Sequence, residues 1–163
     1  MPKQNQQAHA LSKNSKGLAR KIVTPVNATN VITNETVKTQ GIWDTGATGT
    51  MITKSIAAGL GLLPVSTATV KGIYGKKEVN VYYVNIAFEN KGITTKTKVF
   101  ECEELSADNS VGMLIGMNII TMGDFAITNY QGNTTMSFRV PSLEKIDFAI
   151  DANEGSNLDK VFL

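Results

Sequence analysis

The sequence predicts an all-β fold that carries one or two short helices. Between Ile22 and Val140, short runs of β-branched and aromatic residues alternate with turn-forming residues, and helical periodicity is scarce. The run 77–88 alternates as a strand does, and Gly72 and Gly75 mark the tip of a tight hairpin. A chain of 163 residues that is 42% hydrophobic is long enough and apolar enough for one domain with a buried core.

The individual elements follow from these runs and from the residues that interrupt them. Turn-forming clusters at 27–30 and 129–133 separate neighbouring strands, and Pro141 ends the last strand of the series. The expected strands cover 22–26, 36–38, 40–43, 65–73, 77–88, 93–100, 125–128 and 134–140. One helix is expected at 55–62, capped by Thr53 or Ser55, and a second at 117–122.

The two ends of the chain differ from its middle. Residues 1–18 are rich in Gln, Asn, Ser and Lys, which predicts a disordered polar tail. Residues 19–140 are expected to form the domain, and 141–163 a C-terminal extension with a candidate strand at 146–150. No apolar run is long enough for a membrane span and no secretory signal is visible, so a cytoplasmic protein is expected.

Composition excludes several kinds of chemistry. A net charge of +2 is too balanced to predict a nucleic-acid partner. The single cysteine, Cys102, rules out an internal disulfide, and the single histidine, His9, argues against Ser-His or Cys-His catalysis. No metal site and no cofactor are expected. Carboxylates are the acid–base groups that remain for an enzyme of this composition.

The informative segment is residues 41–48. An apolar strand ends there in Asp44, which is followed by Thr45 and by Gly46, a residue that lets backbone approach closely. Thr48 adds a second hydroxyl at short range. For an isolated Asp-Thr-Gly tripeptide, an Asx-turn that closes a strand would be a sufficient interpretation.

Two further segments give this tripeptide a context. The three segments are 42–47 (IWDTGA), 71–75 (KGIYG) and 114–120 (LIGMNII), in that order. Together they resemble the retropepsin-like aspartic proteases, the single-lobe relatives of pepsin. The resemblance extends from Ile22 to Val140, roughly three quarters of the chain. It implies a closed β-barrel with a flap hairpin, and a polypeptide substrate.

The resemblance also implies roles for individual residues. Asp44 would be the catalytic acid, and the loop residues Thr45, Gly46, Ala47 and Thr48 would support it. In this scheme Thr45 joins a hydrogen-bond lattice across a two-fold axis, and the Gly46 carbonyl binds the substrate backbone. The flap would comprise Gly72, Ile73, Tyr74 and Gly75, and the residues behind the site would be Leu114, Ile115, Gly116 and Asn118. Asn118 either bonds near the catalytic loop or caps the following helix.

Catalysis of this type needs two carboxylates that share one proton, because two like charges this close cannot both ionise. Among the six aspartates only Asp44 precedes Thr-Gly; the others are Asp108, Asp124, Asp147, Asp151 and Asp159. The second catalytic carboxylate must therefore come from a second copy in a C2 homodimer. Retroviral members often carry an Asp and an Arg that buttress the dimer where this chain has Thr48 and Met117. Dimer cohesion is therefore expected from 19–40 or 141–163.

Two alternatives remain open at this point. The fold could be a catalytically silent binding or assembly module that retains Asp-Thr-Gly as a structural feature. The protein could also cleave only itself, within the flexible polar segment 1–20.

Overall fold

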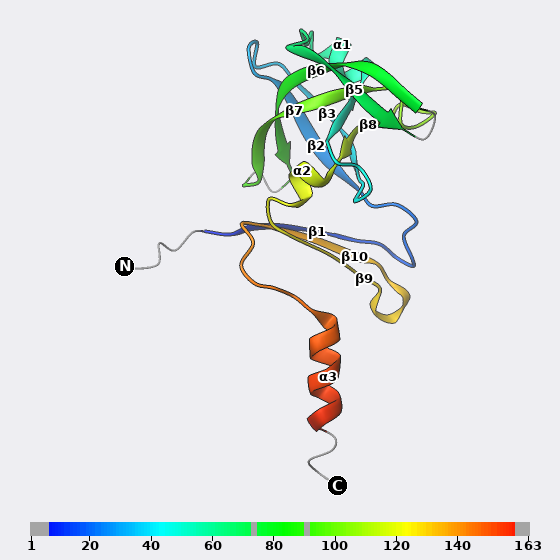
Figure 1. Cartoon of the computed structure of the whole chain (residues 1–163), viewed down its shortest axis with the longest axis vertical. Coiled ribbons are helices and arrows are strands. Elements are labelled where there is room, and N and C mark those ends of the chain that lie inside the picture. Colours follow the sequence, from blue (N-terminus) through cyan, green and yellow to red (C-terminus); the bar gives the residue numbers. More distant parts are fainter. Residues whose placement is uncertain (1–6, 73–74, 90–91, 159–163) are drawn as a thin grey trace.

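The computed structural model describes residues 7–72, 75–89 and 92–158, in two β-sheets and a few short helices (Figure 1). The strands of the larger sheet are β2 (Val23–Asn30), β3 (Thr36–Trp43), β4 (Met51–Thr53), β5 (Ser66–Gly72), β6 (Gly75–Phe88), β7 (Thr94–Cys102) and β8 (Val111–Ile115). The smaller sheet contains β1 (His9–Asn14), β9 (Asp124–Thr128) and β10 (Thr135–Val140). The helices are α1 (Lys54–Gly59), α2 (Met117–Ile120), α3 (Phe148–Leu158) and the 3₁₀ turn η1 (Tyr130–Gly132).

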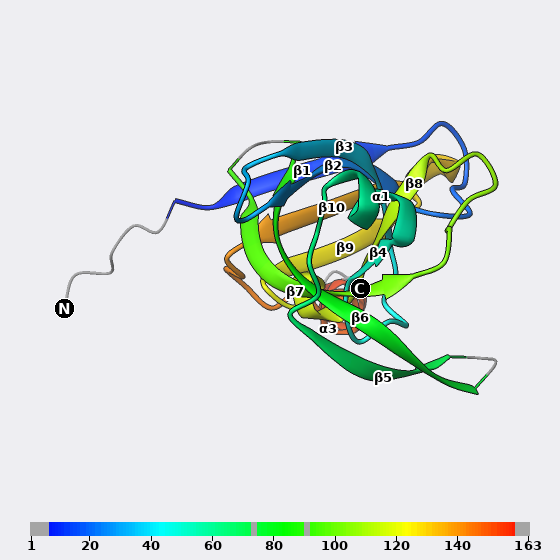
Figure 2. The same ribbon diagram turned by 90° about the horizontal axis from the view of Figure 1, so that it is seen from above.

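The larger sheet closes on itself and confirms the predicted all-β barrel. Its strand order is β2-β3-β8-β4-β7-β6-β5, and a further pairing of β2 with β6 completes the ring (Figure 2). Strand β5 stays outside the ring and pairs with β6 as a hairpin. Closure leaves fewer exposed strand edges and surrounds one apolar core. Core residues include Val26, Ala28, Ile52, Val84, Ile86, Phe88, Val99, Met113 and Ile115.

Two parallel pairings bring distant segments together at one end of the barrel. Strand β3 runs parallel to β8 with Trp43 opposite Ile115, and β4 runs parallel to β7. The approach of β3 to its neighbours depends on Gly41, where a Cβ atom would lie 2.7 Å from Cδ1 of Ile115. The loop after β3 and the loop after β8 therefore begin side by side.

The smaller sheet packs against the barrel through Trp43. The Trp43 ring lies 5.3 Å from Phe125 of β9 and 5.0 Å from Phe138 of β10, centre to centre, and 5.4 Å from Phe88 of the barrel. Its indole N–H donates to Thr24 Oγ1 at 3.0 Å, which satisfies the one polar group of a buried side chain. Trp43 is therefore a core residue that joins the two sheets.

Both expected helices are present, and Thr53 caps the first through its side chain. Two expectations for the chain ends are wrong. Residues 9–14 of the predicted tail form strand β1, which pairs with β10, a strand too distant in sequence for local patterns to reveal. The candidate strand at 146–150 is the beginning of α3, because the Asp147 carboxylate accepts hydrogen bonds from the N–H groups of Ala149 and Ile150 and starts a helix.

Candidate active site

Asp44 stands at the end of β3, where the two parallel strands end together. Its N–H donates to the carbonyl of Ile115 at 2.9 Å, which fixes the backbone of the acid to β8. The residue as a whole is half-buried, and its carboxylate accepts the N–H of Gly46 at 2.8 Å through Oδ1. The Asx-turn expected of the bare tripeptide is therefore present, and it holds the carboxylate in one orientation.

Helix α2 braces the loop behind Asp44. Its first N–H groups, which no helical carbonyl can satisfy, donate to the loop instead: Met117 N to Ala47 O at 2.8 Å and Asn118 N to Thr48 O at 3.2 Å. Gly116 permits this close approach, since a Cβ there would lie 2.5 Å from the carbonyl oxygen of Gly49. The expected packing of the apolar-apolar-Gly segment behind the loop thus has a defined geometry.

Thr50 is a site residue that the sequence analysis missed. Its side chain is fully buried, and Oγ1 accepts the N–H of Gly116 at 3.1 Å while donating to Asn118 Oδ1 at 2.8 Å. Asn118 therefore bonds to loop 44–50 through its side chain, and Gly116, the N-cap residue of α2, provides no side-chain cap. A hydroxyl that both accepts and donates locks the loop to α2.

The remaining loop residues face outward in the single chain. Thr45 and Thr48 are exposed, and Ala47 is half-buried. Leu114 is also half-buried, whereas Ile115 and Gly116 are buried next to the loop. The hydrogen-bond lattice expected of Thr45 needs a second copy of the chain, so this role stays a prediction.

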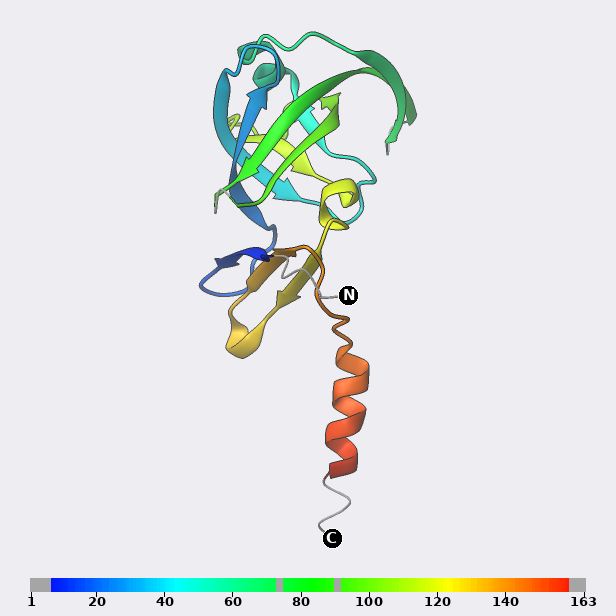
Figure 3. The same ribbon diagram turned by 90° about the vertical axis from the view of Figure 1, so that its left-hand side faces the viewer.

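The hairpin of β5 and β6 projects on the side of the barrel where loop 44–50 lies (Figure 3). Its strand pairing extends to Gly72 and Gly75. Gly75 has a φ of 109°, a backbone angle that residues with a side chain rarely adopt. The expected flap residues Ile73 and Tyr74 lie outside the described residues. The role of this hairpin as a flap stays a prediction.

A cavity of about 420 Å³ separates this hairpin from the barrel. Met51 of β4 and the hairpin residues Val70 and Val79 give it apolar walls, and Lys54 and Glu103 lie at its polar part. Asp44 is not among the residues that line this cavity.

The family model for aspartyl proteases matches residues 29–119, more than half of the chain. The chain belongs to the aspartyl protease family. Its retropepsin-like character, predicted from three short segments, is thereby confirmed.

Solved structures of this fold include three similar proteins. A retropepsin-like aspartic protease from Rickettsia conorii is 14% identical, with a TM-score of 0.49 over 83% of this chain and 98% of that one. The retroviral protease-like domain of Ddi1 from Leishmania major is 17% identical, with a TM-score of 0.45 over 77% and 97%. The simian foamy virus (mac) protease is 22% identical, with a TM-score of 0.40 over 59% and 90%. A search of curated proteins gave no significant match.

Cys102 lines the cavity beneath the β5–β6 hairpin but is poorly suited to act as a nucleophile. Burial, and then the nearby carboxylates of Glu104, Glu103 and Glu101, raise the pKa of its thiol to about 12. The thiol is therefore protonated at neutral pH. Across the described residues, no cluster of three or more His, Cys, Asp or Glu side chains is placed to hold a metal ion. No helix in that part of the chain is long and apolar enough to cross a membrane.

Proposed function

We propose that the protein is an aspartic endopeptidase whose active form pairs the Asp44 carboxylates of two copies. The observation that carries this proposal is the fixed Asp44 carboxylate at the end of β3, on a loop that α2 braces from behind. A preorganised carboxylate on the side of the barrel from which the β5–β6 hairpin projects suits general acid–base attack on an extended polypeptide.

The reaction needs a proton that moves between two groups. With one proton shared by the pair, the unprotonated carboxylate takes a proton from water as the water oxygen attacks the peptide carbonyl carbon. The protonated carboxyl donates a hydrogen bond to the carbonyl oxygen, which gains negative charge. The carboxyl that took the proton from water then donates it to the leaving amine nitrogen as the peptide C–N bond breaks, and the other carboxylate regains its proton from a hydroxyl of the tetrahedral intermediate. The hairpin excludes bulk water and strengthens these interactions.

The requirement for two carboxylates makes the homodimer part of the proposal. Among the described residues no hydrogen bond joins Asp44 to another carboxylate, and Asp44 is the only aspartate followed by Thr-Gly. A surface suited to self-association lies on the smaller sheet, where β9 is an edge strand. Exposed apolar side chains gather along and beyond it: Ile127, Leu143, Ile146, Phe148 and Ile150.

We propose that β9 of one copy pairs with β9 of its partner in antiparallel fashion. A two-fold axis pairs identical strands in this way, and unpaired N–H and C=O groups of an edge strand are natural partners for a second strand. A groove of about 790 Å³ between β9 and residues 142–148 offers room for the partner's side chains. This surface would stabilise the dimer in place of the Asp–Arg ion pair, which Thr48 and Met117 cannot form.

The absent buttress also supports a second candidate, a catalytically silent binding module. Cleavage separates the two. Wild type and Asp44→Asn are incubated with a diverse peptide library from pH 3 to 7, and products are identified by mass spectrometry, including any cut within residues 1–20. Cleavage by wild type that is absent from Asp44→Asn supports the enzyme. Dimeric wild type without any cleavage supports the silent module.

A further inference from the structure

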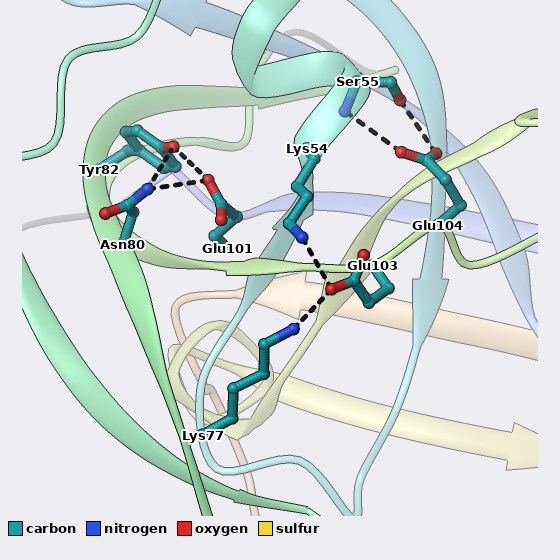
Figure 4. Close-up of polar contacts among 8 residues, drawn as sticks. All are labelled: Lys54, Ser55, Lys77, Asn80, Tyr82, Glu101, Glu103 and Glu104. Atoms are coloured by element: carbon teal, nitrogen blue, oxygen red, sulfur yellow. Dashed lines mark hydrogen bonds and ion pairs between the residues drawn. The ribbon is translucent and has the colours of Figure 1, made fainter.

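Three charged side chains meet across the cavity beneath the β5–β6 hairpin. Glu103 Oε1 accepts Lys54 Nζ at 2.8 Å and Lys77 Nζ at 2.5 Å, so a single carboxylate oxygen joins two ammonium groups (Figure 4). We call this set, Lys54, Glu103 and Lys77, the Glu103 bridge. All three residues also line the cavity of about 420 Å³.

The bridge connects the hairpin to the body of the barrel. Lys77 lies two residues beyond Gly75 and opposite Val70, in the part of β6 that only β5 accompanies. Glu103 directly follows β7, and Lys54 begins α1. In the described chain β5 pairs with no strand other than β6, so the outer half of the hairpin has few other attachments.

Neighbouring glutamates have other partners. Glu101 accepts hydrogen bonds from the Tyr82 hydroxyl and from Asn80 Nδ2, at or next to the part of β6 that already runs beside β7. Glu104 accepts hydrogen bonds from the N–H and hydroxyl of Ser55 at the start of α1. Among these three neighbouring glutamates, at 101, 103 and 104, Glu103 is the one that bonds to the outer part of the hairpin, at Lys77 (Figure 4).

We propose that Glu103 is a positioning residue that holds the β5–β6 hairpin over the cavity and sets the width of the opening beneath it. Its consequence for substrate binding rests on the proposed protease function, whereas the restraint on the hairpin does not. Lys54 holds the carboxylate from the barrel side, and Lys77 transmits the restraint to the hairpin.

The exposure of the bridge makes the restraint weak and reversible. Side chains of Lys54, Lys77 and Glu103 are 51%, 59% and 64% exposed, so water and salt screen their attraction. A restraint of this strength favours the observed position of the hairpin without preventing its displacement when a substrate enters. Hydrogen bonds from Lys54 and then Lys77 lower the pKa of Glu103 to about 2, which keeps the carboxylate charged in weakly acidic solution.

Amide hydrogen exchange in the full chain tests the restraint without any need for catalysis. In Glu103→Gln, amides of 66–72 and 75–79 should exchange about two- to fivefold faster than in wild type at low salt. The difference should disappear near 1 M NaCl, where screening acts over only ~3 Å. Glu104→Gln is the matched control and should leave these amides unchanged. Equal exchange in Glu103→Gln and wild type, or an equal increase in Glu104→Gln, would overturn the proposal.

The lysine end of the bridge provides an independent pair of variants. Lys77→Gln should reproduce the faster exchange, and Lys76→Gln, on the neighbouring residue, should not. On a cleaved library peptide, Glu103→Gln should raise KM about two- to fivefold with a smaller change in kcat. A fall in kcat alone would contradict a positioning role. If dimeric wild type cleaves nothing, the proposed protease function fails, and the exchange result alone decides the role of Glu103.

Discussion

Replacing Thr50 with Val removes one hydroxyl from the buried contact between loop 44–50 and α2. The two side chains have nearly the same shape, so little space is opened. Gly116 N–H, which donates to Thr50 Oγ1 at 3.1 Å in a buried setting, loses its acceptor. Asn118 also loses its donor, but its exposed side chain can turn to water.

The size of the loss in stability follows from the Gly116 N–H group, which is left without an acceptor. A buried donor without an acceptor costs about 1–3 kcal/mol, so the free energy of unfolding should fall by about 2 kcal/mol. That change is a factor of roughly 30 in the ratio of folded to unfolded protein. Proteolytic activity should fall further than stability alone requires, because the loop that orients Asp44 loses one of its hydrogen-bonded connections to the α2 segment.

Urea denaturation at one fixed protein concentration measures the first effect, and peptide cleavage below the unfolding range measures the second. Thr50→Ser keeps the hydroxyl and should retain most of the stability. Thr48→Val, at an exposed loop position, should leave the free energy of unfolding nearly unchanged. If the free energy of unfolding of Thr50→Val lies within about 0.5 kcal/mol of the wild-type value, the Thr50 hydroxyl does not hold the loop to α2.

Three other predictions concern separate regions. Ile127→Lys places a charge on the exposed edge strand β9 and should shift sedimentation toward monomer and lower activity at low concentration while the monomer stays folded; an unchanged dimer would exclude this edge as the interface. Cys102 has its thiol pKa raised to about 12, so iodoacetamide at pH 8 should modify the native protein far more slowly than the urea-unfolded protein; equal rates would contradict the burial of the thiol. Hydrogen bonds from Ser142, from the N–H of Leu143 and from Arg139 lower the pKa of Asp124 to about 2. The stability advantage of wild type over Asp124→Asn should therefore be complete above about pH 5 and should vanish as the pH falls toward 2, in denaturation curves recorded across that range; an advantage independent of pH would refute the assignment.

The parts of the fold that the sequence predicts well are those marked by short motifs of adjacent residues. Asp-Thr-Gly, the paired glycines of the hairpin and the apolar-apolar-Gly segment each occupy a few adjacent residues, and each marks a turn or a close approach in the structure. Strand β1 depends on pairing with β10, more than a hundred residues away, and a polar segment of six residues shows no sign of that partner.

Alternation misled the interpretation of the C-terminal segment. Ile146, Phe148 and Ile150 are spaced as one face of a strand, yet the capping carboxylate of Asp147 begins a helix between them. Thr50 was missed for a related reason, because irregular loops have no periodicity to separate a buried threonine from exposed ones. Its burial is visible only once β4, β8 and α2 surround it.

The central claim is that one active site uses the Asp44 carboxylates of two copies. Mixing wild type with Asp44→Asn at constant total concentration, after time for subunit exchange, tests this directly. If both carboxylates are required and the variant pairs normally, an equal mixture should retain about a quarter of the activity of wild type, because only dimers of two wild-type chains are active. Retention of about a half, in direct proportion to the wild-type chain, would show that each copy works alone and would contradict the paired site.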